Sequence, residues 1–229
     1  MNTTLSSGEL AGLIDLHLHR PDATATDVKE LCRQAREHKF HAVSVNGCWV
    51  TLARHCLDDT EVKVASVVGF PLGAMDADVK RYETEAAIDV MAQEIDAVLN
   101  IGRLKDGDTQ FVLRELRDLV EAADERPVKV ILEAPLLTRD EKLLACELIV
   151  ESGAKFVQTA TGFGPGRTTV EEVELLREAV GEPFGLKASG GIRDTRAALA
   201  MIKAGATRLG TCQGVAILEG LITAAATSN

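Results

Sequence analysis

The chain has few aromatic residues, an odd number of cysteines and no long apolar run. Aromatic residues make up 3% of its 229 residues, so Ala, Val, Leu and Ile must build the core, as in buried parallel strands covered by helices. Five cysteines without a CxxC pair argue against a disulfide framework and favour a reducing, cytoplasmic setting. No apolar run approaches the roughly 20 residues that span a bilayer.

Basic residues are also scarce. The formal net charge is −10, which argues against a nucleic-acid partner and against an anionic membrane surface. The segment 1–9 has neither a basic region nor an apolar stretch, so no secretion signal is expected. Hydrophobic residues are 46% and charged residues 26% of the chain, close to the globular average, which excludes a disordered chain.

One pattern repeats from end to end: a short apolar run, a polar turn, then an amphipathic segment. It predicts about eight strands that alternate with about eight helices, hence βαβ units and a parallel sheet. The expected strands are Leu13–Leu18, Ala42–Asn46, Val62–Gly69, Ile95–Ile101, Val128–Glu133, Phe156–Thr159, Phe184–Ala188 and Thr207–Gly210. The expected helices include Thr26–Glu37, Asp76–Met91, Thr109–Ala123, Thr138–Ser152, Thr169–Val180 and Thr195–Ala204.

Eight such units in this length indicate an α/β fold, a closed (β/α)8 TIM barrel that forms a single domain over residues 1–229. An open doubly wound sheet is the alternative. In a barrel, the chemistry lies at the carboxyl ends of the strands. The side chains expected there are Asp15, His17, His19, Ser44, Asn46, Asp96, Asn100, Glu133, Gln158 and Lys187.

Glycine-rich loops follow the last three expected strands. Gly190 and Gly191 follow the seventh, and Cys212 and Gln213 stand in the loop after Gly210, which ends the eighth. Backbone N–H groups and helix N-termini in such loops bind phosphate in many barrels. Thr161 and Gly162, after strand six, could close the same anion pocket. The alternative is a set of tight turns that need glycine.

Lys187 and Asp96 are charged residues inside apolar runs. A lysine there is costly to bury unless it is paired or functional, so Lys187 is a candidate proton shuttle or amine nucleophile. Asp96 is a candidate general acid or base. A structural ion pair of Lys187 with Asp96 or Glu133 is the alternative, and it is compatible with catalysis.

Asp15, His17 and His19 share one face of the first strand, because side chains alternate along a strand. The spacing suggests a metal site, but His38, His41 and His55 do not stand at later strand ends. Two imidazoles alone make a weak site. No metal and no cofactor are therefore predicted, and the histidines are expected to line the pocket.

A series of stretches along the chain matches one known family in order. They are Leu13-Ile14-Asp15, Arg20-Pro21-Asp22-Ala23-Thr24, the run 64–73, Glu94-Ile95-Asp96, Thr159-Ala160-Thr161-Gly162-Phe163-Gly164, Lys187-Ala188-Ser189-Gly190-Gly191-Ile192-Arg193 and the run 204–211. On these stretches the chain resembles, from end to end, the deoxyribose-phosphate aldolase family. The resemblance implies a cytosolic (β/α)8 barrel, dimeric or tetrameric, with metal-free chemistry in which a lysine amine forms an imine with acetaldehyde and the enamine adds to glyceraldehyde 3-phosphate.

The resemblance breaks at the position of the imine-forming lysine. The family context Phe-Val-Lys-Thr-Ser-Thr-Gly reads Phe-Val-Gln-Thr-Ala-Thr-Gly here, with Gln158 in place of the lysine. The two proton-relay residues carry over onto Asp96 and Lys187, and Asp15 matches a pocket residue. Other pocket positions differ. Cys212 and Gln213 replace two serines of the phosphate loop, and His17 and His19 replace a threonine and an aliphatic residue.

These features predict a lyase that makes or breaks a C–C bond in a small carbonyl or sugar-phosphate-like substrate. Without a lysine at 158, the imine would move to Lys187, or Asp96, Lys187 and His17 would act as non-covalent acids and bases. Gln158 would hydrogen-bond a substrate oxygen. The alternatives are an ordinary 2-deoxyribose-5-phosphate aldolase and a non-catalytic sugar-phosphate-binding paralogue.

Overall fold

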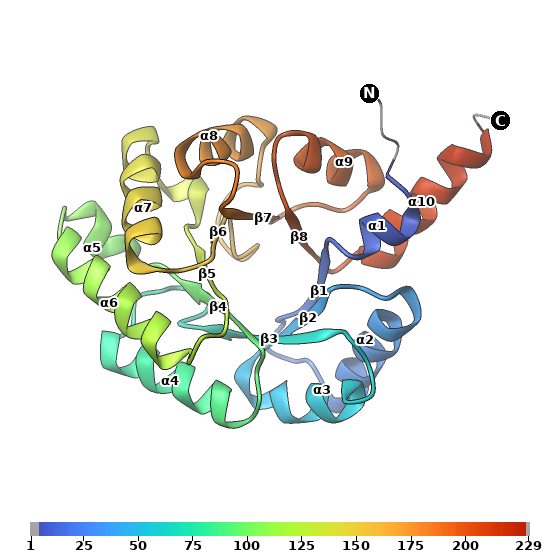
Figure 1. Cartoon of the computed structure of the whole chain (residues 1–229), viewed down its shortest axis with the longest axis horizontal. Helices are drawn as coiled ribbons and strands as arrows, with labels where there is room; N and C mark the ends of the chain where they lie inside the picture. Colours follow the sequence, from blue (N-terminus) through green and yellow to red (C-terminus); the bar gives the residue numbers. More distant parts are fainter. Residues whose placement is uncertain (1–4, 228–229) are drawn as a thin grey trace.

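Eight parallel strands close into a barrel in chain order, from β1 through β8 and back to β1. Figure 1 looks into the barrel, with the helices in a ring around it. The closure confirms the predicted (β/α)8 architecture and excludes the open sheet. The strands are β1 (Ile14–Leu18), β2 (Ala42–Val45), β3 (Lys63–Val68), β4 (Glu94–Val98), β5 (Val128–Ile131), β6 (Phe156–Gln158), β7 (Gly185–Ser189) and β8 (Arg208–Thr211).

The six expected helices all form, with ends that shift by a few residues. They are α2 (Ala25–His38), α4 (Ala77–Asp89), α6 (Thr109–Ala122), α7 (Arg139–Ser152), α8 (Val170–Val180) and α9 (Thr195–Lys203). Six further short or terminal helices complete the chain: α1 (Ser7–Ala11), η1 (Gly47–Trp49), α3 (Val50–Leu57), α5 (Ile101–Lys105), η2 (Ala134–Leu136) and α10 (Gly214–Thr227).

The computed structural model describes residues 5–227, with side chains to residue 223. The outermost residues of the predicted domain, 1–4 and 228–229, lie outside this range. Helices α1 and α10 pack together beside β1, so both described ends of the chain lie on the same side of the barrel (Figure 1). Within the described residues, no helix combines the length and apolar character that a membrane span requires.

Local sequence signals explain where the helices begin and end. Thr24, Thr138 and Thr169 each cap a helix and form a reciprocal capping box with an acid three residues later. Gly153 ends α7 in the left-handed conformation at φ 89°, which glycine adopts without a Cβ penalty. These caps satisfy backbone groups that would otherwise be left without partners at the helix ends.

Two expected strands run too far by more than one residue: β5 ends at Ile131 and not at Glu133, and the larger error is in β4. The run Ile95–Ile101 was expected to be strand throughout, but β4 ends at Val98. Asn100 caps α5 instead, because its side chain accepts a hydrogen bond from the N–H of Arg103. An Asn at this point satisfies a free helix donor, which favours a helix start over a continued strand.

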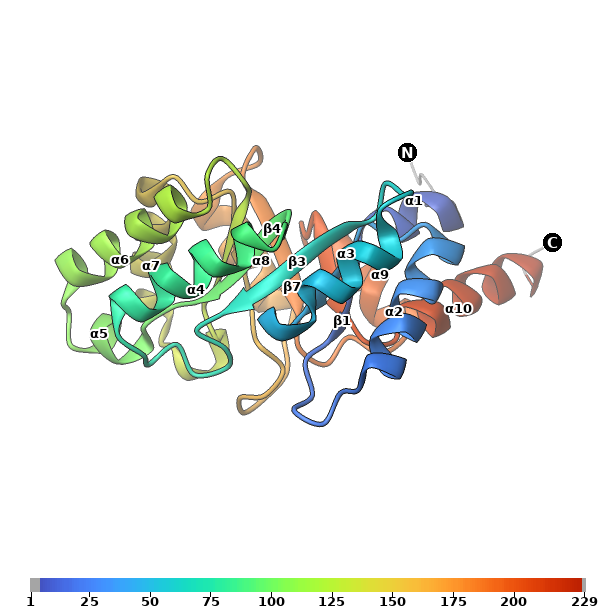
Figure 2. The ribbon, with the colours of Figure 1, turned by 90° about the horizontal axis from the view of Figure 1, so that it is seen from below.

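The strands are buried on both faces, as parallel barrel strands are. In β4 the outward residues Ile95 and Ala97 pack under the helices, while Glu94 and Asp96 point into the barrel. The polar residues therefore gather at the centre of the barrel, inside an apolar shell. The β1–α2 loop and the β6–α8 loop extend together from the lower edge of Figure 2, which is the carboxyl-terminal face.

A buried ion pair outside the barrel connects α4 to α6. Lys80 Nζ lies 2.8 Å from Glu115 Oε1 and 2.9 Å from the carbonyl oxygen of Val98. Both side chains are fully buried. Removing one partner leaves the other charge buried and unpaired, which costs far more than the pair itself contributes.

We therefore expect Glu115→Ala to lower the free energy of unfolding by about 3–5 kcal/mol. The matched control is Glu85→Ala, which breaks the exposed Arg81–Glu85 pair on α4 and should cost less than about 1 kcal/mol. Urea unfolding of both variants measures the difference. Equal losses would show that the Lys80–Glu115 pair adds nothing beyond a surface pair.

Candidate active site

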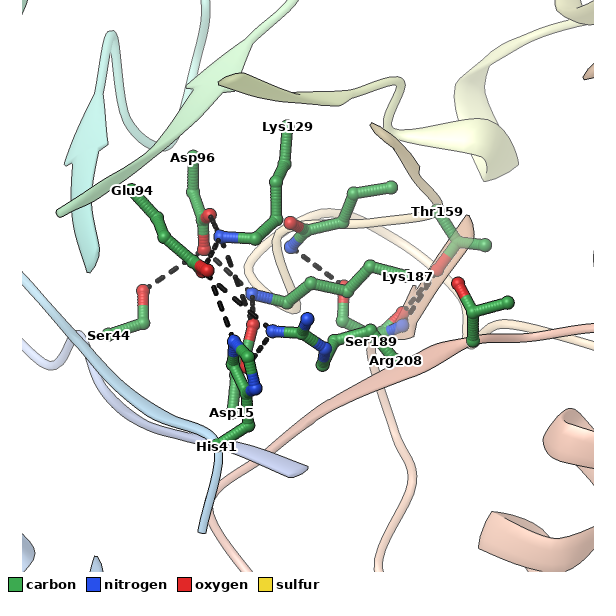
Figure 3. A network of polar contacts seen from close by, with 12 residues as sticks. Asp15, His41, Ser44, Glu94, Asp96, Lys129, Thr159, Lys187, Ser189 and Arg208 are labelled. Carbon is green, nitrogen blue, oxygen red and sulfur yellow. Dashed lines mark hydrogen bonds and ion pairs between the residues drawn. The ribbon is translucent and has the colours of Figure 1, made fainter. Parts of the chain in front are cut away.

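A network of charged side chains fills the centre of the barrel (Figure 3). Within the described residues, its three acids and three bases balance in formal charge, and all but Arg208 are buried. Such balance is what allows charges to remain in a low-dielectric interior. The members are Asp15 on β1, Glu94 and Asp96 on β4, Lys129 on β5, Lys187 on β7 and Arg208 on β8.

Lys187 lies between two carboxylates. Its Nζ is 2.8 Å from Asp15 Oδ2 and 2.7 Å from Asp96 Oδ2. Gly210 on the neighbouring strand makes room for this side chain, because a Cβ there would lie 3.0 Å from Lys187 Cε. The expected ion pair with Asp96 is therefore present. Glu133, the other expected partner, instead accepts hydrogen bonds from the backbone and hydroxyl of Thr161.

Lys129 is a second lysine at the centre of the barrel. Its Nζ lies 2.7 Å from Asp96 Oδ1 and 2.6 Å from Glu94 Oε2. Burial lowers the pKa of Lys129, but Asp96 and Glu94 outweigh it, and the pKa stands above its ordinary value. Lys129 is thus a fixed cation.

Asp96 is correspondingly a fixed anion. Burial alone would raise its pKa, but Lys129 and Lys187 hold the pKa well below the ordinary range. Ser44 Oγ donates a further hydrogen bond to Asp96 Oδ2, at 3.1 Å. A carboxylate with three donors is a poor proton acceptor on its own, so the expected acid/base role of Asp96 depends on its partners.

Gln158 is the register partner of Lys187 and faces the same interior. Its Nε2 lies 2.9 Å from Ser189 Oγ, and the Ser189 hydroxyl is 2.5 Å from the carbonyl oxygen of Ala160. Since the single Ser189 proton goes to Ala160, Ser189 can only accept from Gln158. The amide orientation is fixed, and its buried Oε1 has no partner among the described residues.

His17 and His19 lie at the mouth of the barrel. Their rings stack with centroids 4.9 Å apart, and His19 also packs on Phe70 at 4.8 Å. Burial and the nearby Lys187 lower the pKa of His17 to about 4, so its ring is neutral at neutral pH. The structure thus brings His17 to Lys187, as expected.

The predicted anion loops meet at the carboxyl-terminal face. Gly190 and Gly191 have φ angles of 98° and 86°, and a Cβ on Gly162 would lie 4.0 Å from the Cα of Gly190. Cys212 and Gln213 are exposed in the loop after β8, where the Gln213 N–H already bonds Thr211 Oγ1. The loops after β6 and β7 are therefore in contact with each other.

The other end of the barrel carries a cavity of about 530 Å³, lined by residues that include His41. His41 Nε2 lies 3.1 Å from Glu94 Oε1, which joins it to the charged network. Asp15, His41 and Glu94 are the one group in the described range whose atoms could surround a metal ion. Lys129 and Arg208 already neutralise these carboxylates, and neither His17 nor His19 belongs to the group.

The sequence reasoning missed half of the network. Lys129, Arg208 and Glu94 were not among the expected site residues, although the argument made for Lys187 applies to them. Lys129 and Arg208 each stand in a short apolar run of an expected strand. A charge in such a run is the signal that could have found them.

The comparisons with known proteins agree with this geometry. Residues 12–221 match the sequence profile of the DeoC/LacD family aldolases. The chain belongs to this family. It is 50% identical to the deoxyribose-phosphate aldolase 1 of Bacillus licheniformis over 214 residues, which are 93% of this chain and 96% of that protein. It is 49% identical to a deoxyribose-phosphate aldolase of Thermoanaerobacter over 213 residues, 92% and 96% of the two chains.

Solved structures of this aldolase family have the same fold. An aldolase named QR15 superposes with a TM-score of 0.91 at 36% identity, covering 96% of this chain and 99% of that one. The tetrameric deoxyribose-phosphate aldolase of Aeropyrum pernix superposes with a TM-score of 0.89 at 32% identity, covering 96% and 93%. The chain is therefore a deoxyribose-phosphate-aldolase-like lyase with a TIM-barrel fold.

The lowered pKa of His17 predicts an acid-sensitive fold. The unfolded chain takes up a proton on this histidine as the pH falls through about 6.5, whereas the folded chain resists until about 4. The unfolded state thus binds more protons in this window, so the free energy of unfolding decreases as the pH is lowered. We expect the free energy of unfolding to drop by about 2 kcal/mol more in the wild type than in His17→Gln between about pH 7 and about pH 4.5.

Urea unfolding at the two pH values measures this difference. His55→Gln is the control, because His55 is exposed on α3. If His17→Gln lost as much stability on acidification as the wild type, the His17 ring would not be held neutral by the fold.

Proposed function

We propose that this aldolase makes or breaks a C–C bond in a small carbonyl or sugar-phosphate-like substrate without an imine. The observation that carries the proposal is the pairing of Gln158 with Lys187 on neighbouring strands. A primary amide has no nucleophilic amine, so Gln158 cannot form the covalent intermediate. Both lysines at the centre of the barrel, Lys187 and Lys129, are each engaged by two carboxylates.

The charge balance opposes a relocated imine at Lys187. Imine formation needs a neutral amine, but loss of the Lys187 proton would leave three carboxylates facing two cations in a buried site. As an ammonium, Lys187 is instead suited to donate a proton to a carbonyl oxygen and to stabilise the enolate that develops there. Asp15 and Asp96 hold its Nζ in position, at 2.8 and 2.7 Å.

Gln158 supplies the complementary group. Its unpartnered Oε1 is a fixed acceptor in the buried site, and such an atom costs free energy until a donor reaches it. A substrate hydroxyl is the donor that aldol chemistry provides. Gln158 would therefore orient a hydroxylated substrate and would not react with it.

The glycine loops support a phosphorylated substrate. Gly162 and Gly191 are exposed, and the buried Gly190 lies beside Gly162, at the face where barrels bind phosphate. Cys212 and Gln213 offer no hydroxyl there, so we expect a looser phosphate requirement. The reaction needs no metal or cofactor in this scheme. Free cysteines suit the cytoplasm, and the tetrameric relative favours a homodimer or homotetramer.

Two alternatives are separated by substituting Gln158. The near 50% identity to proteins named deoxyribose-phosphate aldolase favours the ordinary cleavage of 2-deoxyribose 5-phosphate. A protein that binds sugar phosphates without turnover is the second alternative.

We expect Gln158→Lys to cleave 2-deoxyribose 5-phosphate at least about 100-fold faster than the wild type. The new amine would stand beside the cation of Lys187, which disfavours its charged form, so the amine at position 158 would be free to form an imine. The wild type should instead join at least one pair from a panel of acetaldehyde, acetone or dihydroxyacetone phosphate with glyceraldehyde 3-phosphate or glycolaldehyde. Proton NMR follows both reactions.

The control is Gln110→Lys, which adds the same charge on the exposed face of α6 and should change neither rate. Wild-type cleavage of 2-deoxyribose 5-phosphate as fast as that of Gln158→Lys would identify an ordinary aldolase and overturn the proposal. Saturable binding without any C–C bond chemistry would overturn it in favour of the non-catalytic protein.

A further inference from the structure

A chain of hydrogen bonds leads from the mouth of the barrel to the buried lysine. His19 Nε2 lies 3.0 Å from Ser44 Oγ, and Ser44 Oγ lies 3.1 Å from Asp96 Oδ2. The same carboxylate oxygen lies 2.7 Å from Lys187 Nζ. Figure 3 shows the inner part of this path, from Ser44 through Asp96 to Lys187.

The direction of each hydrogen bond follows from Asp96. An ionised carboxylate only accepts, so the single proton of the Ser44 hydroxyl points to Asp96. The Ser44 oxygen must then accept from His19, which places the His19 proton on Nε2. The other ring nitrogen, Nδ1, is left with a free lone pair.

His19 is also held in a neutral state and in a fixed plane. Burial and the neighbouring His17 lower the pKa of His19 well below its ordinary value, against an opposing effect of Asp96. The stack on His17 and the contact with Phe70 restrict rotation of the ring. The side chain is partly exposed at the mouth, where a substrate enters. The fixed ring plane and the free nitrogen at the mouth are the geometry that a general base needs, and the hydrogen bond to Ser44 gives the opposite ring nitrogen a proton acceptor.

We infer that His19 is the general base of the proposed reaction, and that Ser44 and Asp96 position it and connect it to the acid, Lys187. This inference rests on the non-covalent function proposed above. It assigns the proton-abstracting role to His19, whereas the sequence suggested His17. Within the described residues, His17 makes no hydrogen bond to Asp96.

The protons balance over the two steps. In the first, His19 Nδ1 takes a proton from the carbon beside the donor carbonyl, and the C–H electron pair becomes the C=C bond of the enol. The His19 Nε2 proton moves to Ser44, the Ser44 proton moves to Asp96, and Asp96 returns a proton to Lys187, which has protonated the carbonyl oxygen.

In the second step the path runs backward. The enol O–H proton returns to Lys187, the C=C electron pair forms the new C–C bond, and the acceptor carbonyl oxygen takes the proton from His19 Nδ1. Lys187, already an ammonium, gives a proton to Asp96 as it accepts the enol proton. Asp96 passes one to Ser44, and Ser44 restores the proton on His19 Nε2. The hydrogen removed from carbon ends on the new hydroxyl, and the protein regains its starting state.

The tautomer of His19 tests the path without any substrate. Two-dimensional proton–nitrogen NMR on ¹⁵N-histidine-labelled protein resolves the ring nitrogens of its five histidines, and His19→Gln identifies the His19 signals. We expect a protonated Nε2 and an unprotonated Nδ1 at about pH 7, and a mixture of tautomers in Ser44→Ala. Ser44→Cys, which keeps a donor of similar size, should restore part of the preference. A protonated Nδ1 in the wild type would overturn the inference.

The base itself is tested by hydrogen exchange. In D₂O the wild type should exchange the protons beside the carbonyl of acetaldehyde or dihydroxyacetone phosphate, as followed by proton NMR. His19→Gln should slow this exchange by about 100-fold or more and Ser44→Ala by about 10-fold. His55→Gln, on the exposed side of α3, should exchange at the wild-type rate.

The outcomes separate the inference from the function beneath it. Exchange by the wild type that persists in His19→Gln would overturn the role of His19 and leave the non-covalent function standing. A wild type that exchanges neither probe would overturn the proposed function, and the base with it. Thermal unfolding of each variant confirms that it is folded.

Discussion

The balanced charge network at the centre of the barrel is the constraint on which the site depends. Three carboxylates and three cations from five strands stay ionised together, because each makes contacts of about 3 Å with an opposite charge. Changing the charge of one member alters the protonation of its neighbours. The network therefore determines which amine can react and which can only donate a proton.

Position 158 has its effect through this network. A lysine there would be a fourth cation beside three carboxylates, so one amine would more readily become neutral and nucleophilic. The neutral amide of Gln158 leaves the balance of three carboxylates and three cations intact. The histidines at the mouth fit the same scheme, because a charged lysine favours a neutral His17 and leaves His19 available as a base. In the proposed function, Gln158 thus changes the chemistry of the site within an unchanged fold.

The fold was predictable from the sequence because strand and helix signals alternate regularly. Apolar runs marked all eight strands, and Thr138 and Thr169 marked helix starts, whereas α2 begins after Thr24 and not at the expected Thr26. The site was only partly predictable. Lys187 and Asp96 stood out as charges in apolar runs, but Lys129 and Arg208 are partners only because distant strands meet in the barrel. The role of Ser44 depends on a hydrogen bond to a residue 52 positions away, which no local pattern reports.

The central claim is that this aldolase site works without an imine. The most direct measurement is an intact and peptide-level mass spectrum of the wild type after borohydride treatment in the presence of acetaldehyde, under conditions in which exchange at its methyl group is observed. The account predicts an unchanged mass. A reduced adduct on Lys187, absent from Lys187→Ala, would contradict it and would show that the amine chemistry moved across the barrel.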